Sequence, residues 1–350
     1  MKVWSVLIAI LVFGLLVLTH ELGHYIAARA CHVRVREFSI GFGPRLLWYT
    51  SKKTGIKYSL AMIPFGGFVS MDGEEGASND PDALNAKPAW QRMIIMAAGG
   101  LVNLITGFIL MFALVLTSVP GSTVVARHTG EEGSGSAAVL QQGDEILSVA
   151  GRRVHTAQEL SYAVMRYGVK EVDVVVLRGG EEMTLRVSFP VQEESGQKIG
   201  VCDFIVYAAQ KNFGNVMKYT FYQSVNTVRM VWESVYDLIT GRFTMDALSG
   251  PVGITGAISD AVSGAGGFRQ GAIAVLYFAS IIAINLGVVN LFPLPALDGG
   301  RILCLLIGII IRRPIPEKVE ATIHGVGMAL LFGLLIFITV KDVIGLIPRS

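Results

Sequence analysis

The sequence predicts a polytopic α-helical membrane protein with four transmembrane helices, a membrane-associated β region and one inserted α+β domain. Of its 350 residues, 52% are hydrophobic and only 16% are charged, and the mean hydropathy is +0.55. This composition excludes an ordinary soluble globular protein. Four windows lack Asp, Glu, Lys and Arg, and each approaches or exceeds the roughly 20 residues that a helix needs to cross a bilayer. They are residues 3–19, 93–126, 271–297 and 321–340.

The first window ends at His20-Glu21-Leu22-Gly23-His24. On a helix, residues four apart lie one turn above each other, so both imidazoles can bind one metal ion. Glu21 can then take a proton from water that zinc has acidified. Charged and metal-binding side chains in an apolar span usually mark a functional site, although a coincidental polar helix end is the alternative. Cleavage of the first window as a secretory signal would remove the motif, so we expect a retained span.

The segment after this helix has the alternation of short β-strands, around a turn at residues 52–55. Gly66 and Gly67 follow in the second strand, where they would allow another backbone to approach closely. One interpretation is an edge strand that binds an extended substrate by strand addition; the other is a plain connecting loop. Residues 72–88 are rich in Gly, Asp, Glu, Asn and Pro, and we expect a mobile loop there.

The second window carries Asn103 among Gly99, Gly100 and Gly107. Small residues at this spacing permit close helix contacts, and a buried amide needs a partner inside the bundle. Asn103 therefore either forms a hydrogen bond near the site or forms one that only holds two helices together, and the sequence leaves both open.

Residues 122–190 have the pattern of a separate domain, with a helix over 157–167 and strands over 172–178 and 183–189. The Gly143-Asp144 turn, the apolar strand after it and Gly151 resemble the core of a PDZ domain, which implies an extended peptide ligand; a spacer without a ligand is the alternative. Residues 212–238 predict an amphipathic helix that lies on the outer membrane surface or packs on the neighbouring domain.

The third window contains Asn285 and Asn290 and then runs through Pro293 and Pro295 to Asp298. Prolines and glycines must interrupt this helix, and broken membrane helices are tolerated chiefly where they line a buried or watery site. Asp298 is the natural third ligand for a catalytic zinc, which keeps its fourth position for water. The alternative is a structural ion pair between Asp298 and Arg301.

The distribution of basic residues predicts which side of the membrane each connection faces. Nine Lys or Arg lie between the first two windows and four between the last two, so both connections are expected on the cytoplasmic side and the inserted domain on the other. The net charge of +2 gives no support for nucleic-acid binding. Three distant cysteines suggest neither a disulfide framework nor a metal cluster.

The HELGH motif, Phe65-Gly66-Gly67-Phe68-Val69 and the segment from Asn290 to Arg301 together resemble the bacterial RseP-type site-2 protease family, peptidase family M50. The resemblance implies one zinc ion per chain on His20, His24 and Asp298, with Glu21 as base and substrate handling by Asn290 and Pro293. It also implies intramembrane cleavage, in the bacterial inner membrane, of single-span proteins such as a trimmed anti-sigma factor or signal-peptide remnants. Two features depart from relatives: a single PDZ unit, and Gly99-Gly100 in place of Gly-Pro before the Asn.

The expected organisation is 1–30 first span, 31–92 β region and loop, 93–120 second span, 121–192 PDZ domain, 193–268 extension with an amphipathic helix, 269–312 broken third span and 320–347 fourth span. We expect substrate contacts from Asn285, Asn290, Pro293, Gly66, Gly67 and Asn103, and partners in the lipid bilayer, a single-span protein and a peptide ligand of the PDZ domain. The rival class is a membrane scaffold with structural zinc, which would not need Glu21. A metal transporter is disfavoured because a charged relay across the other spans is missing.

Overall fold

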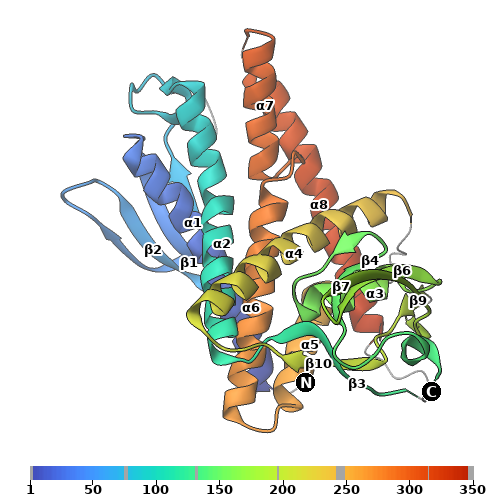
Figure 1. The fold of residues 1–350 in the computed structure, drawn as a ribbon. Coiled ribbons are helices and arrows are strands. Elements are labelled where there is room, and N and C mark those ends of the chain that lie inside the picture. The colour runs from blue at the N-terminus through green and yellow to red at the C-terminus, as the bar shows by residue number, and fades with distance from the viewer. Residues whose placement is uncertain are drawn as a thin grey trace. The chain divides into compact units, whose positions relative to one another are not determined.

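The computed structural model describes residues 3–74, 78–130, 133–194, 197–241, 249–313 and 315–345. The chain forms two compact units, one of residues 1–110 and 248–350 and the other of residues 111–247 (Figure 1). Residues 75–77, within the expected loop, and 242–248, within the expected extension, lie outside the described residues.

Within the described residues, four helices are long and apolar enough to cross a membrane, as the sequence predicts: α1 (Val3–Ala30), α2 (Ala89–Thr117), α6 (Phe268–Asn290) and α8 (Glu317–Gly345). The shortest has 23 residues, which at about 1.5 Å per residue matches the hydrocarbon thickness of roughly 30 Å. Large apolar side chains such as Leu11 and Leu15 are exposed on α1. Such side chains suit contact with lipid, so the chain is an integral membrane protein.

The third apolar window is broken, as predicted. Helix α6 ends at Asn290, residues 291–297 form an irregular loop, and α7 (Asp298–Ile310) begins at the expected ligand. The prolines at 293 and 295 cannot continue the hydrogen-bond ladder of a helix. A shorter helix, α5 (Pro251–Ser263), precedes α6.

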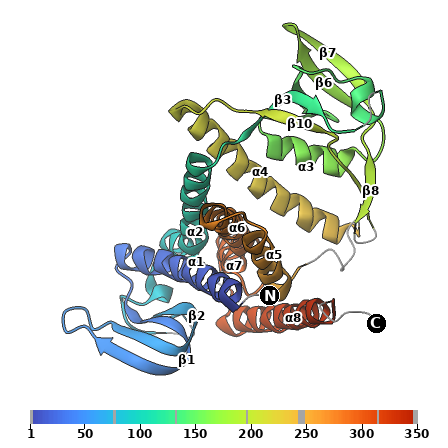
Figure 2. The same cartoon turned by 90° about the horizontal axis from the view of Figure 1, so that it is seen from below.

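The β region is one antiparallel hairpin of β1 (Val35–Thr50) and β2 (Lys57–Met71), and it lies beside α1 in Figure 2. Residues Glu37 to Ile40 of β1 are paired on both sides, with residues 57–60 and with residues 67–70 of β2. The second pairing leaves residues 67–70 at an edge of the sheet. Apolar side chains of the hairpin bury against Ile95 of α2, and a 3-10 turn, η1 (Leu84–Ala86), leads into that helix.

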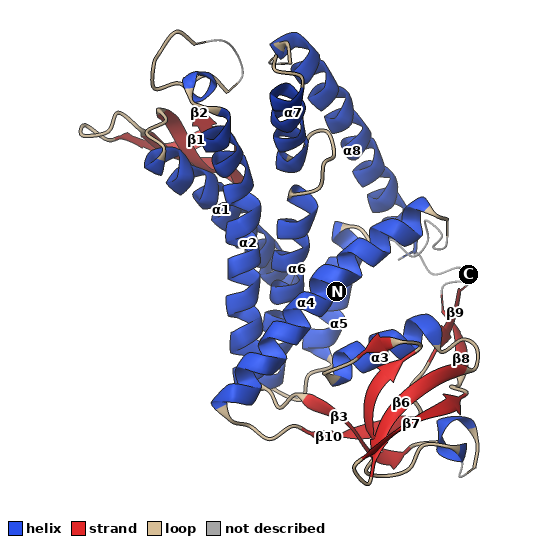
Figure 3. Ribbon diagram, turned by 45° about the horizontal axis from the view of Figure 1, so that its top comes forward, coloured by secondary structure: helices blue, strands red, loops and turns tan. Residues whose placement is uncertain are grey.

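The second unit is built on an antiparallel sheet in the order β10 (Phe204–Ala208), β3 (Gly121–His128), β4 (Glu145–Val149), β6 (Val172–Arg178) and β7 (Glu181–Val187), with β5 (Arg152–Arg153) paired to β4 (Figure 3). Helix α3 (Ala157–Tyr167) packs on it over an apolar core that includes Val125, Ile146 and Leu160. The observed α3 and β6 have the predicted bounds, whereas β7 both begins and ends two residues earlier than predicted. A turn η2 (Gly135–Ala138) and a hairpin of β8 (Val191–Glu194) and β9 (Gln197–Gly200) complete the unit. Because β10 pairs with β3, the sheet extends beyond the boundary expected at residue 192.

Helix α4 (Phe213–Ile239) follows the sheet and is joined to it mainly through polar side chains. Arg166 of α3 donates to the fully buried Asp237, and Arg152 donates to Glu233. His155 stacks on Tyr222 with ring centroids 3.8 Å apart. Part of the predicted apolar stripe, including Val216 and Tyr219, is buried, whereas other apolar residues of α4 are exposed.

Candidate active site

Helix α1 presents His20, Glu21 and His24 to the interior of the first unit. Both imidazoles are buried, and because they lie one turn apart their Nε2 atoms are 3.2 Å from each other. The rings meet edge to face. Two nitrogen ligand atoms therefore converge on one point, as the spacing of the motif predicts.

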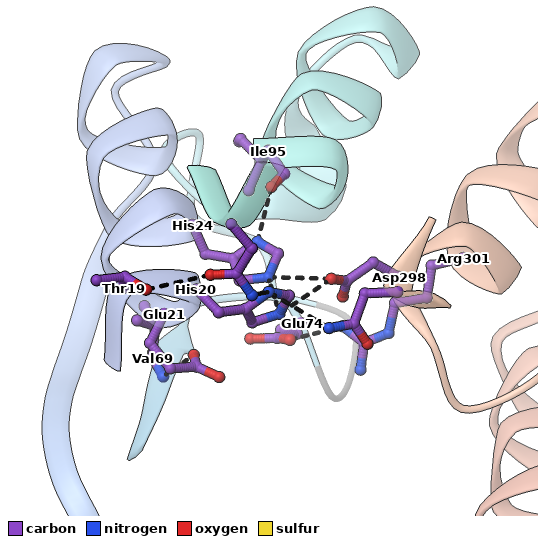
Figure 4. Close-up of polar contacts among 11 residues, drawn as sticks. Thr19, His20, Glu21, His24, Val69, Glu74, Ile95, Asp298 and Arg301 are labelled. Atoms are coloured by element: carbon purple, nitrogen blue, oxygen red, sulfur yellow. Dashed lines mark hydrogen bonds and ion pairs between the residues drawn. The ribbon is translucent and has the colours of Figure 1, made fainter. Parts of the chain in front are cut away.

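Asp298, the first residue of α7, completes a triangle with the two histidines (Figure 4). Its Oδ2 lies 3.2 Å from Nε2 of His20 and 3.2 Å from Nε2 of His24. Zinc–ligand bonds of about 2.0–2.1 Å at tetrahedral angles place neighbouring ligand atoms roughly 3.3 Å apart. Three electron-pair donors at that mutual distance fit a zinc ion, and they repel one another unless a cation lies between them.

The other ring nitrogen of each histidine has a partner outside the triangle. Nδ1 of His24 is 2.8 Å from the carbonyl oxygen of Ile95 on α2, and a carbonyl can only accept a hydrogen bond. That contact puts the proton of a neutral ring on Nδ1 and leaves the Nε2 lone pair for a metal. Nδ1 of His20 lies 3.4 Å from the amide nitrogen of Asn103 and 3.5 Å from that of Asn290.

Glu21 points to the β hairpin rather than into the triangle. Its Oε2 accepts a hydrogen bond from the backbone N–H of Val69, with an N–O distance of 3.1 Å (Figure 4). A carboxylate held this way adjoins the histidines but is not a member of the ligand group. The arrangement matches the general-base position of an HExxH enzyme.

The triangle and Glu21 line a cavity of about 890 Å³. Strand β2 forms one wall from Gly67 to Met71, and Asp298 and Arg301 of α7 form another. Glu37 also lines the cavity, but its hydrogen bond from Arg45 lowers its pKa to about 2. Glu37 therefore stays ionised and ion-paired at neutral pH, whereas Glu21 is the carboxylate that follows His20 directly on α1.

Two glycines allow the helices that build the site to meet. A Cβ atom on Gly23 would lie 2.5 Å from the carbonyl oxygen of Ala98, so this residue of the motif lets α1 approach α2. A Cβ atom on Gly99 would lie 2.3 Å from Nε2 of His24. The His24 ring therefore fits beside α2 only because residue 99 has no side chain. The pattern of small residues in the sequence predicted close helix contacts but not this contact with the histidine.

The expected substrate residues fall into two groups. Gly66 and Gly67 lie on β2, where a Cβ on Gly67 would lie 2.6 Å from the carbonyl oxygen of Ser39 and 3.8 Å from Cγ of Glu21. Asn103 and Asn290 lie at His20. Asn285 and Pro293 belong to neither group, and among the described residues Gly67 is the one expected substrate residue that lines the cavity.

Other residues at the site were not expected from the sequence. Arg301 forms an ion pair with Glu74, with a nitrogen–oxygen distance of 2.6 Å, so the alternative pairing of Arg301 with Asp298 is wrong for the described residues. Thr19 contacts Asn103, and His324 of α8 contacts the loop before Asp298. No local motif marks these residues, because each partner lies far away in the sequence.

A cluster of two histidines and a carboxylate between apolar helices, with a glutamate beside it, defines the class of membrane-embedded zinc hydrolases. Comparison with known proteins agrees. The model of peptidase family M50 matches residues 8–334. The chain is 34% identical over 341 residues to a protein of Clostridium perfringens whose name provisionally describes it as a zinc metalloprotease, with 97% of this chain and 98% of the relative covered.

Two further relatives have more specific names. The regulator of sigma-W protease RasP of Bacillus subtilis is 29% identical over 427 residues, covering 98% of this chain and 99% of that protein. The zinc metalloprotease RasP of Bacillus licheniformis is 28% identical over 424 residues, covering 97% and 98%. The chain belongs to peptidase family M50 and is a zinc metalloprotease of the site-2 protease type.

Proposed function

We propose that this protease cleaves single-span membrane proteins within the bilayer, with one zinc ion per chain on His20, His24 and Asp298. The observation that carries the proposal is the 3.2 Å triangle of ligand atoms, between helices long and apolar enough to span a membrane and beside Glu21. Zinc, when bound, supplies a Lewis acid that polarises the peptide carbonyl and acidifies water. The chain itself supplies the base, the orientation of the ligands and the surface that holds the substrate.

Glu21 takes the proton from the attacking water and passes it to the amine of the leaving fragment. The Val69 N–H holds one carboxylate oxygen, Oε2, of a side chain that lines the cavity. A transmembrane helix hides its carbonyl groups in its own hydrogen bonds, so the substrate must be locally unwound before attack. The edge formed by residues 67–70 of β2 adjoins Glu21 and is suited to pair with such an extended segment.

The substrate class follows from this geometry and from the relatives. A single transmembrane helix whose outer domain has been removed is the simplest substrate that can reach a site inside the membrane. One relative is named regulator of sigma-W protease RasP, which favours an anti-sigma-factor-like substrate; signal-peptide remnants are of the same chemical kind. The basic connections between the first two spans and between the last two favour the hairpin on the cytoplasmic side of a bacterial inner membrane, and the sheet of residues 121–208 on the other.

The sheet of the second unit supports the proposal of a PDZ domain. An α3 helix packs on an antiparallel sheet after a Gly143-Asp144 turn, which is the arrangement such domains use to bind an extended peptide. We propose that it binds a peptide or protein ligand on the extracytoplasmic side.

The test is cleavage of a tagged single-span protein, truncated on its outer side, by the purified chain in lipid vesicles. Glu21→Gln is expected to abolish the shorter fragment while zinc content stays at one ion per chain. Glu182→Gln, at an exposed position on β7, is the matched control and should cleave like the wild type. Equal cleavage by Glu21→Gln and wild type would contradict the proposed base, and no cleavage by wild type of several such substrates would contradict the substrate class.

A further inference from the structure

The loop that delivers Asp298 to the site is held from outside by α8. The backbone N–H of Ala296 donates a hydrogen bond to Nδ1 of His324, with an N–N distance of 2.9 Å. Ala296 has φ of +74°, in the left-handed region. A residue with a Cβ adopts this region only at an energetic cost, so the surroundings must hold it there.

The next turn of α8 contacts the same loop. A Cβ on Gly327 would lie 2.3 Å from Cβ of Pro295, so the helix and the loop meet without space for a side chain. Residues 324 and 327 are three apart and lie on one face of α8. A Cβ on Gly300 would lie 3.3 Å from Cε1 of His324, so α7 packs against the same ring.

Ala296 is separated from Asp298 of the ligand triangle by one residue, so the contact with α8 lies next to the ligand. Ala296 is followed by Leu297 and then by Asp298, and the backbone N–H of Gly300 donates to the carbonyl of Leu297. The position of Ala296 therefore limits where the Asp298 carboxylate can lie relative to His20 and His24. Zinc–oxygen bonds stay within about 0.2 Å of their usual length, so a shift of a few tenths of an ångström in that carboxylate weakens metal binding.

A second metal site at His324 would be a different explanation of the same ring. The ligand atoms of Cys304, Glu320 and His324 lie within 4.8 Å of one another. However, Nδ1 of His324 accepts a hydrogen from Ala296, so the neutral ring carries its proton on Nε2 and has no lone pair there for a metal. The hydrogen bond to the loop and a metal ion on Nε2 exclude each other in a neutral ring.

We propose that His324 is a positioning residue, which sets the place of Asp298 in the zinc site by accepting the Ala296 N–H. The inference rests on the proposed zinc ligands but not on any substrate. It assigns to the fourth span a role in metal binding, although that span contributes no ligand to the triangle.

The test compares acceptors at one position. His324→Asn keeps an oxygen near the place of Nδ1, His324→Gln moves the acceptor one bond further away, and His324→Leu removes it. Each full-length protein, purified in detergent, is titrated with Co²⁺ to record the d–d absorption of the site, and its zinc affinity is measured by competition with a chelator. We expect His324→Leu and His324→Gln to weaken zinc binding by about 10- to 100-fold and to alter the Co²⁺ spectrum. His324→Asn should keep the zinc affinity within a few-fold of the wild type and keep the wild-type spectrum.

A second pair of variants separates positioning from misfolding. Gly327→Ala should push Pro295 and weaken zinc binding in the same way, whereas Gly325→Ala, whose Cβ has nothing within 4 Å, should bind zinc like the wild type. Cys304→Ser and Glu320→Gln should leave one zinc ion per chain at unchanged affinity. Wild-type affinity and spectrum in both His324→Leu and Gly327→Ala would overturn the proposal. A second zinc ion that is lost in the Cys304 or Glu320 variant would also overturn it. Failure of the wild type to cleave its substrate, with these metal readouts unchanged, would count against the proposed function alone.

Discussion

Asn103 of α2 lies against the His20 ring, with its amide nitrogen 3.4 Å from Nδ1 of His20. Its amide oxygen is 3.1 Å from the hydroxyl oxygen of Thr19. The Thr19 hydroxyl is closer to another acceptor, the Leu16 carbonyl, at 2.8 Å. Zinc on Nε2 of His20 requires the proton of the neutral ring on Nδ1, where it needs an acceptor. Rotation of the Asn103 amide about its last side-chain bond would place its oxygen there, and Thr19, with its proton on the Leu16 carbonyl, would accept from the amide nitrogen. The oxygen then faces His20 Nδ1–H, which frees the Nε2 lone pair for zinc.

This relationship predicts that Asn103 supports metal binding rather than only helix packing. Asn103→Leu should weaken zinc affinity by about 10- to 100-fold, because the proton on Nδ1 of His20 loses its acceptor. Asn103→Asp keeps the oxygen and should lose less. Chelator competition measures both, and equal affinities for Leu and wild type would show that Asn103 serves only the contact between helices.

Gly99→Ala should abolish zinc binding, because the new methyl group would lie 2.3 Å from Nε2 of His24. The control is Gly333→Ala on α8, where a Cβ meets nothing within 4 Å. Zinc content after purification distinguishes the two variants, and thermal unfolding in detergent checks that both are folded. A Gly99→Ala protein with a full zinc complement would mean that α2 can move away from α1 without loss of the site.

The ion pair of Arg301 and Glu74 joins α7 to the segment after β2, on two walls of the cavity. Arg301→Gln and Glu74→Gln should each reduce cleavage by roughly tenfold, because either change leaves the other charge partly buried without its partner. The double variant should be less impaired than the product of the single effects. Cleavage rates of the four proteins form a double-mutant cycle, in which simple multiplication of the two effects would argue against coupling.

The second unit should lose stability in acid through Asp144. Burial raises the pKa of this carboxyl, but the hydrogen bonds from Arg178 and from the Gln141 N–H outweigh burial, so the pKa lies below its ordinary value. A depressed pKa in the folded state adds stability above the unfolded pKa, near 4, and that stability is lost as pH falls through the folded value. The protection factors of the backbone amides at residues 141–151, which compare their exchange rates with those of an unfolded chain at the same pH, should therefore fall below about pH 4. In the Asp144→Asn variant, the same amides should already exchange fast at pH 7, and their protection should change less with acid. An unchanged protection pattern in that variant would contradict the role of the Asp144–Arg178 pair.

Several features of this protein follow from the sequence by itself. The four spans follow from composition, because a long uncharged run has no other stable environment than lipid or a deep core. His20, Glu21 and His24 follow from helical periodicity, since the separation of residues four apart is set by local geometry. The break before Asp298 follows from Pro293 and Pro295, and helix α3 and strand β6 follow from local apolar patterns and turns.

Only the tertiary structure decided which residues surround the metal ligands. Asn103 at His20, Glu74 at Arg301, the absent side chain of Gly99 and the hydrogen bond from Ala296 to His324 all join segments far apart in the chain. Periodicity and residue type describe a residue's neighbours along its own element. They carry no information on the distance between two elements, which is set by how the helices and the hairpin pack. For that reason the proposed ligands could be named from the sequence, whereas the groups that contact them could not.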